Sequence, residues 1–198
     1  GDWSGAAFLL VAGAIAGPIV VKGVQLNSTQ ADKAVMQALK DAGASIDINE
    51  NAIQIGPAKD KAGVVGSLKA FEFDATHCPD LFPPLVALAA VCSGVTILHG
   101  VSRLAHKESD RGLTLQKEFA KLGIRIELNQ DRMMVYGGTG IYGAEVSSHH
   151  DHRIAMACGV AALCADGPVS ITNAEAVNKS YTDFFKQLQH LGAKVDLD

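Results

Sequence analysis

A charged hexapeptide, residues 106–111 (His-Lys-Glu-Ser-Asp-Arg), lies between two apolar runs of the chain. The run before it, 95–98, predicts a strand, and the run after it, 113–122, has the spacing of an amphipathic helix. The charges therefore fall at a strand-to-helix turn. Free backbone N–H groups and the helix dipole favour an anion at such a turn.

Lys107, Glu108 and Arg111 are of the types that bind an anion and transfer a proton. A Lys and an Arg can hold a phosphate or a carboxylate, and a Glu beside them can move a proton. A solvated helix start capped by Ser109 or Asp110 would carry the same charges without forming a site. The hexapeptide alone leaves both interpretations open.

One unit recurs three times along the chain: a helix, a strand, a polar loop, a second helix and a hairpin. The repeats are expected at about 1–68, 69–140 and 141–198, and the third lacks its hairpin partner. Glycines follow the helices at equivalent places, where left-handed caps are expected. They are Gly17, Gly94 and Gly167 after the first helices, and Gly43, Gly123 and Gly192 after the second. The acids expected to cap the first helices are Asp2, Asp80 and Asp151.

The first helix of each unit is rich in Ala and Gly and is apolar nearly all round. Such helices are expected inside, with the sheets outside them. The predicted class is α/β (α+β), with three repeated helix-strand-helix-hairpin units in a single domain over 1–198.

Corresponding loops of three units related by a rough three-fold would meet at one end. Ionisable or polar residues lie on these loops in every unit. They are Asp2, Gln30, Asp80, Lys107, Glu108, Arg111, Asp151, Arg153 and Lys179. Basic residues gathered around Asp80 and Glu108 would form a site for an anionic substrate.

Composition narrows the class of protein. A hydrophobic content of 48% is ample for a buried core, and a net charge of −4 without long basic blocks argues against nucleic-acid or membrane partners. The long apolar stretches are broken by Gly, so they are expected to be buried helices, and no signal peptide is expected. Four cysteines without C-x-x-C spacing fit a reducing, cytoplasmic setting. The first residue is not Met, and the chain is expected to be a piece of something longer.

Residues 149–152 (His-His-Asp-His) raise the alternative of a metal site. The histidines are adjacent in sequence and no second ligand group follows at finger-like spacing, so no metal is expected there. His152 is instead expected to order the neighbouring Asp151 and Arg153.

Six stretches of the chain resemble the EPSP synthases, the 3-phosphoshikimate 1-carboxyvinyltransferases. They are residues 1–2 with the following Ala-rich helix, 27–32, 79–80, 107–111, 151–156 and 179–185, in the order of that family. The resemblance covers only the C-terminal of the family's two domains. It implies that an N-terminal domain of the same polypeptide completes the enzyme, that the full-length enzyme is monomeric, and that this chain alone is inactive.

The resemblance also implies a reaction and residue roles. The enolpyruvyl group of phosphoenolpyruvate is transferred to shikimate 3-phosphate with loss of phosphate, and neither a metal nor a cofactor is needed. Asp80 would contact the substrate hydroxyl as the base, Lys107 would contact the shikimate side, and Glu108 would protonate the phosphoenolpyruvate methylene. Phosphoenolpyruvate would be held by Arg111, Arg153 and Lys179.

Two alternatives are weighed against this interpretation. The UDP-N-acetylglucosamine enolpyruvyl transferases share the fold and one substrate, but residues 107–111 and 179–181 favour the shikimate enzyme. A non-catalytic three-repeat anion-binding domain would explain the scaffold. It would not explain why ionisable residues concentrate on equivalent loops.

Overall fold

The element order of the chain repeats, as the sequence predicts. The structure is a computed structural model that describes residues 1–50, 52–59, 62–105 and 107–197; His106 of the charged hexapeptide lies outside them. The first repeat has α1 (Trp3–Ala16), β1 (Ile19–Lys22), α2 (Val35–Asp41), β2 (Ser45–Asn49) and β3 (Ala52–Gly56). The second has β4 (Glu72–Asp74), α3 (Phe82–Val91), β5 (Gly94–His99), α4 (Arg111–Lys121), β6 (Arg125–Asn129) and β7 (Arg132–Gly137). The third has β8 (Glu145–Ser147), α5 (His152–Ala162), β9 (Ser170–Thr172) and α6 (Phe184–His190).

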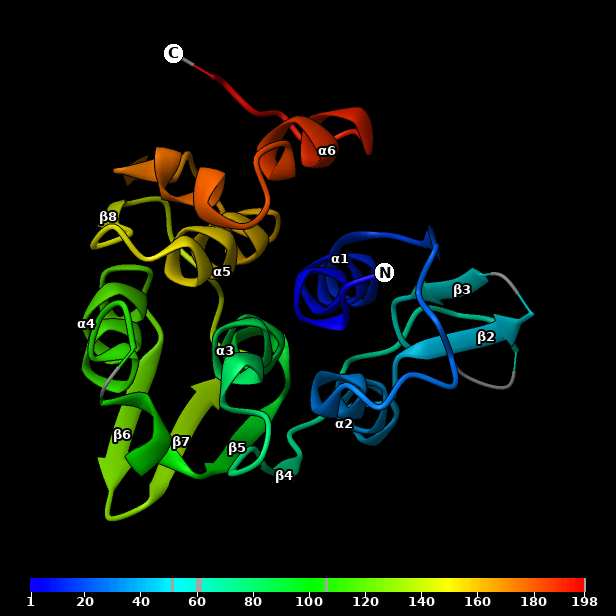
Figure 1. Ribbon diagram of the computed structural model, residues 1–198, viewed down its shortest axis with the longest axis horizontal. Helices are drawn as coiled ribbons and strands as arrows, with labels where there is room; N and C mark the ends of the chain where they lie inside the picture. The colour runs from blue at the N-terminus through cyan, green and yellow to red at the C-terminus, as the bar shows by residue number, and fades with distance from the viewer. Residues whose placement is uncertain (51, 60–61, 106, 198) are drawn as a thin grey trace.

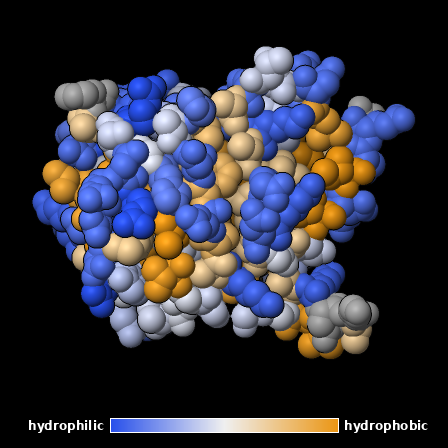
Figure 2. Space-filling model, turned by 90° about the horizontal axis from the view of Figure 1, so that it is seen from below, coloured by the Kyte–Doolittle hydropathy of each residue, from blue (hydrophilic) through white to orange (hydrophobic). Residues whose placement is uncertain are grey.

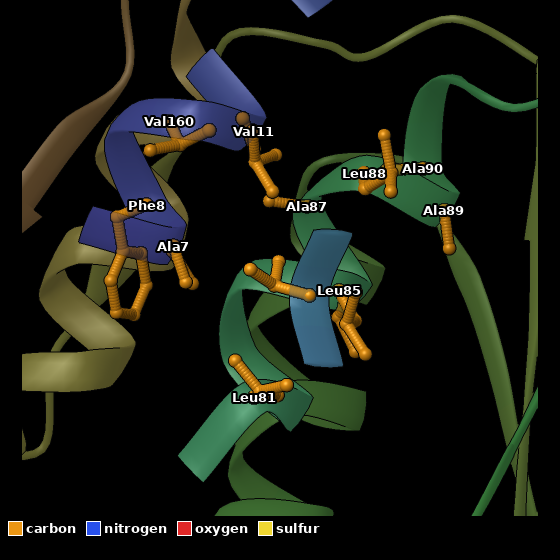
Figure 3. Close-up of a cluster of buried hydrophobic side chains, with 14 of the residues drawn as sticks. Ala7, Phe8, Val11, Leu81, Leu85, Ala87, Leu88, Ala89, Ala90 and Val160 are labelled. Carbon is orange, nitrogen blue, oxygen red and sulfur yellow. The ribbon is translucent and has the colours of Figure 1, made fainter. Parts of the chain in front are cut away.

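The first helices α1, α3 and α5 contact one another at the centre, and the sheets lie outside them (Figure 1). Helices with apolar residues on every side gain most free energy when they are buried all round. Phe8 and Val11 of α1, Leu85 of α3 and Val160 of α5 all belong to one cluster of buried hydrophobic side chains (Figure 3). The predicted arrangement of buried helices and outer sheets is confirmed.

Each sheet is built from strands of one repeat. The orders are β1-β3-β2, β4-β5-β7-β6 and β8-β9. The predicted hairpins of the first two repeats pair antiparallel, with Ile48 opposite Ile53 and Leu128 opposite Met133. The strands β4 and β8 pair parallel to β5 and β9. The strands β4 and β8 were not predicted from the sequence, because three residues are too few for an alternating pattern to be recognised.

Glycines end the second helices as predicted, but the expectation for the first helices is wrong. Gly43, Gly123 and Gly192 have φ of 87°, 83° and 103°, which is the left-handed cap conformation. Gly17 has an extended backbone, with φ 163°, because Pro18 follows it and a proline pushes the preceding residue to extended conformations. Gly167 also precedes a proline, and its backbone is not left-handed either.

The second repeat departs at Gly94 as well, which is left-handed (φ 111°) but is the first residue of β5. The preceding helix α3 has already ended at Val91.

Asp2 and Asp151 cap the helices that follow them, and Asp80 does not. Asp2 accepts from the backbone N–H groups of Ser4 and Gly5, and Asp151 accepts from that of Arg153. Asp80 instead lies inside a short 3-10 helix (Pro79–Leu81) that precedes α3. The expected cap at Asp80 is therefore wrong, and its carboxylate is paired with cationic side chains instead.

Successive repeats are joined at equivalent points. The N–H of Lys69 donates to the carbonyl of Ala42 (2.9 Å), and that of Tyr142 donates to the carbonyl of Leu122 (3.0 Å). Both acceptors directly precede the left-handed glycines that end α2 and α4. The chain thus begins each new repeat against the end of the previous second helix.

The surface carries a mixture of residue types. On the face seen from below, hydrophobic residues form a band between hydrophilic areas (Figure 2). Across the described part of the chain, no helix has both the length and the hydropathy needed to span a bilayer. The four cysteines are free, and burial raises the pKa of the Cys92 thiol to about 12, as expected of a cysteine that packs as a small hydrophobe.

Candidate anion-binding and catalytic site

Arg111 is the centre of the site. It is the first residue of α4, and its side chain is 1% exposed. Its Nε donates to Oδ2 of Asp151 (2.8 Å), its Nη1 to Oδ1 of Asp80 (2.8 Å), and its Nη2 to Glu108. Burial would lower the pKa of the guanidinium, but the three carboxylates outweigh burial and raise it. Arg111 therefore remains charged and fixes three acids around itself.

Asp80 is shared between three cations. Besides Arg111, Lys107 Nζ lies 3.2 Å from its Oδ1 and Arg153 Nη2 lies 3.2 Å from its Oδ2. Burial would raise the pKa of this carboxyl, but Arg153, Lys107 and Arg111 outweigh burial and hold the pKa below its usual value. Asp80 is ionised at neutral pH, with 30% of its side chain exposed.

Asp151 links the beginnings of α4 and α5. It is fully buried, caps α5 through the N–H of Arg153 (3.0 Å), and accepts from Ser109 Oγ (3.0 Å) as well as from Arg111. The pairing of Asp151 with Arg111 is not evident from the sequence, which predicts a cap there. Its place on a loop equivalent to those of the other repeats indicated that it lies near the site, but not which residue it would pair with.

His152 lies behind Glu108. Its Nδ1 is 3.6 Å from Oε1 of Glu108 and is a buried polar atom without a hydrogen-bond partner among the described residues. Burial and the neighbouring Arg153 lower the pKa of the imidazole, so His152 is neutral at physiological pH. It contacts a carboxylate as a neutral ring.

Lys179 and Gln30 take other positions. Lys179 Nζ donates to the carbonyl of His150 (2.6 Å), one residue before Asp151. Gln30 accepts from the N–H of Trp3 (2.9 Å) and so holds the beginning of α1. The structure brings Asp80, Lys107, Glu108, Arg111 and Arg153 together directly, and it places Lys179 against the adjoining turn.

The group Glu108, Asp151 and His152 also has the geometry of a metal site, with ligand atoms within 4.8 Å of one another. The guanidinium of Arg111 already contacts both carboxylates. A divalent cation would have to lie beside this buried charge, so these residues fit a metal poorly. The site instead has equal numbers of acidic and basic side chains, three of each. An anion could bind there by replacing a carboxylate as the partner of one of the cations.

The Asp151 carboxyl should make folding stability depend on acid pH. Burial would raise its pKa, but Arg111 and the backbone and Ser109 hydrogen bonds outweigh burial and lower the pKa below its usual 3.8. A depressed pKa contributes stability above the unfolded-state value, and this contribution disappears as pH falls through the folded-state value. We expect the free energy of unfolding, measured by urea denaturation, to fall as the pH drops below about 4.

Asp151→Asn should have a lower free energy of unfolding at neutral pH and a smaller fall over the same pH range. If the free energy of unfolding fell equally in Asp151→Asn and the wild type over this pH range, Asp151 would not be ionised and paired in solution.

The chain is similar to known proteins over nearly its whole length. A family model described as EPSP synthase (3-phosphoshikimate 1-carboxyvinyltransferase) matches residues 1–188. The 3-phosphoshikimate 1-carboxyvinyltransferase of Brachyspira hyodysenteriae is 39% identical over 195 residues, which cover 98% of this chain and 45% of that protein. A solved EPSP synthase from Acinetobacter baumannii superposes with a TM-score of 0.82 at 29% identity, over 98% of this chain and 46% of that one.

The enolpyruvyl transferase NikO from Streptomyces tendae superposes with a TM-score of 0.73 at 21% identity, which shows a shared fold alone. The chain spans about half the length of the relatives that it matches.

Proposed function

This chain belongs to the EPSP synthase family, and from that premise we propose that it is the C-terminal domain of a two-domain enolpyruvyl transferase. The whole enzyme would transfer the enolpyruvyl group of phosphoenolpyruvate to shikimate 3-phosphate and release phosphate. The observation that carries the proposal is the cluster in which Arg111 joins Asp80, Glu108 and Asp151. It combines two partly exposed carboxylates with fixed cations, which the reaction requires.

Asp80 and Glu108 would act on the two protons of the addition step. Asp80 takes the proton of the substrate hydroxyl while the hydroxyl oxygen bonds to the enol carbon of phosphoenolpyruvate. Glu108 gives a proton to the methylene carbon. Phosphate then leaves with the electron pair of its C–O bond. The Glu108 carboxylate, left ionised by the first transfer, takes a proton from the methyl carbon, which restores the double bond. Lys107, which contacts Asp80, would steady charge on the shikimate side.

Binding of the anionic substrates would strengthen Asp80 as a base. Arg153, Lys107 and Arg111 hold its pKa low while no anionic substrate is bound to them. A phosphate or carboxylate that bonds to these cations neutralises part of their charge, so the pKa of Asp80 should rise toward the range where it accepts a proton readily.

The proposed phosphoenolpyruvate ligands differ in accessibility. The Arg153 side chain is 13% exposed and Arg111 only 1%. Arg153 would therefore bind the anion first. Arg111 would contribute only where its pairing with Glu108 opens, and Lys179 would approach from the turn at His150.

The proposal includes the setting of the enzyme. An N-terminal domain would supply the remaining contacts, the complete enzyme would be a cytoplasmic monomer, and it would need neither a metal nor a cofactor. The relatives named 3-phosphoshikimate 1-carboxyvinyltransferase favour this substrate over UDP-N-acetylglucosamine.

We expect the 198-residue chain alone to release no phosphate from phosphoenolpyruvate and shikimate 3-phosphate, because half of a cleft cannot exclude water or hold both substrates in attack geometry. The full-length protein should release phosphate under the same conditions. A coupled assay for inorganic phosphate distinguishes the two. Turnover by the chain alone would refute the two-domain site, and an inactive full-length protein would refute the reaction.

A further inference from the structure

Helix α4 contacts the turn between β8 and α5 at two places, and only one of them belongs to the site described above. Arg111 forms the first contact, with Asp151. Glu118 lies seven residues later, close to two helical turns, and therefore faces the same side of α4. Its side chain is fully buried. The turn that carries Asp151 is thus attached to α4 at two points along one face.

The Glu118 carboxylate accepts three hydrogen bonds. The N–H of Ser147 and the Nζ of Lys121 donate to Oε2 (2.8 and 2.6 Å), and His149 Nε2 lies 2.8 Å from Oε1. Burial would raise the pKa of this carboxyl, but these partners outweigh burial and lower the pKa. A buried, ionised carboxylate bound to residues of another segment holds that segment in place, because leaving it unpaired would be costly.

The turn itself needs such support. His149 and His150 both have left-handed backbones, with φ 51° and 58°. This conformation costs roughly 1–2 kcal/mol for each residue other than glycine. Ser148 Oγ also donates to the carbonyl of Asn173 (2.8 Å) and accepts from the N–H of His150 (3.0 Å). The strained turn is therefore held by Glu118 of α4 and by the segment at Asn173, directly before Asp151.

We propose that Glu118 and His149 are positioning residues for the anion site. They hold residues 147–150 against α4, so that Asp151 meets Arg111 and the next turn of chain places Arg153 beside Asp80. Neither residue would touch the substrate. The inference rests on the proposed function for the identity of the anion, phosphoenolpyruvate.

The test uses the full-length protein with Glu118→Gln and His149→Gly. Glutamine keeps the size of Glu118 but not its charge, and glycine adopts the left-handed backbone freely while removing the ring. We expect the KM for phosphoenolpyruvate to rise about ten- to a hundredfold, since small displacements of positioning groups have effects of this order. The KM for shikimate 3-phosphate should change much less. His149→Gln, which can still donate to Glu118, should recover part of the affinity.

Glu127→Gln is the matched control, because Glu127 is also held by a cation and a neutral donor, Arg125 and Tyr136, but in the exposed hairpin β6–β7. It should leave both KM values unchanged. If Glu118→Gln and His149→Gly lower the melting temperature but not the affinity for phosphoenolpyruvate, their role is structural only and the proposal is overturned.

Binding of inorganic phosphate, followed by calorimetry, separates this proposal from the proposed function. An inactive wild-type protein that binds phosphate, with weaker binding in Glu118→Gln, would refute the reaction and support the positioning role. Equal binding in the two proteins, or no binding to the wild type, would overturn the positioning role.

Discussion

Glu108→Gln should lower kcat of the full-length enzyme about a hundred- to ten-thousandfold, the usual effect of removing a positioned acid or base. Glu108 is 38% exposed and contacts the buried guanidinium of Arg111, with the neutral His152 3.6 Å away. It is thereby fixed at a surface that substrate can reach. Glutamine preserves this shape but carries no transferable proton.

Steady-state kinetics test this prediction, because a group that acts on a proton in the transition state affects kcat more than substrate affinity. Asp80→Asn should behave in the same way. Arg153→Ala should raise the KM for phosphoenolpyruvate in addition to lowering kcat. Near-normal turnover of Glu108→Gln, or an unchanged KM in Arg153→Ala, would show that these loops do not perform the chemistry.

Arg111→Met should destabilise the folded chain by about 3–5 kcal/mol, the usual effect of removing one partner from a buried ion pair. Arg111 compensates the fully buried Asp151 and also binds Asp80 and Glu108. Methionine fills similar space, so the expected loss arises mainly from carboxylates left without their cation. Urea denaturation of the 198-residue chain at neutral pH measures it.

Arg125→Met is the control, since Arg125 forms a solvent-exposed pair with Glu127, and such pairs contribute little to the free energy of unfolding. The difference between Arg111→Met and wild type should narrow in mild acid, because protonated carboxyls no longer need the guanidinium. A loss no larger than that of Arg125→Met would mean that Arg111 is not buried among charges in solution.

The repeats and the buried helices could be predicted because they depend on local pattern. Glycine after a helix, an acid before it and apolar residues all round it are visible in any one unit. The expected caps that proved wrong lie where a neighbouring residue overrode the local pattern. Pro18 imposed an extended backbone on Gly17, and Pro79 begins a 3-10 helix that takes Asp80 out of the cap position.

The site was predicted as a set of residues but not as an arrangement. Charge and repeat position indicate that Arg111, Asp80 and Arg153 gather at one end, yet they do not indicate which pairs form. Arg111 became central because α4 begins beside α5, which is a result of helix packing. Glu118 was missed altogether, because in sequence it resembles any exposed acid of an amphipathic helix.

The confinement of each sheet to one repeat has a consequence for how the chain folds. Strand pairs such as Ile19 with Ile55 and Val95 with Tyr136 close loops inside a single unit, whereas α1, α3 and α5 come from all three. Loop-closure entropy favours the nearer pairings first. During synthesis the first sheet can therefore form while the later units are still unmade, whereas the packing of all three central helices must wait until α5 has emerged.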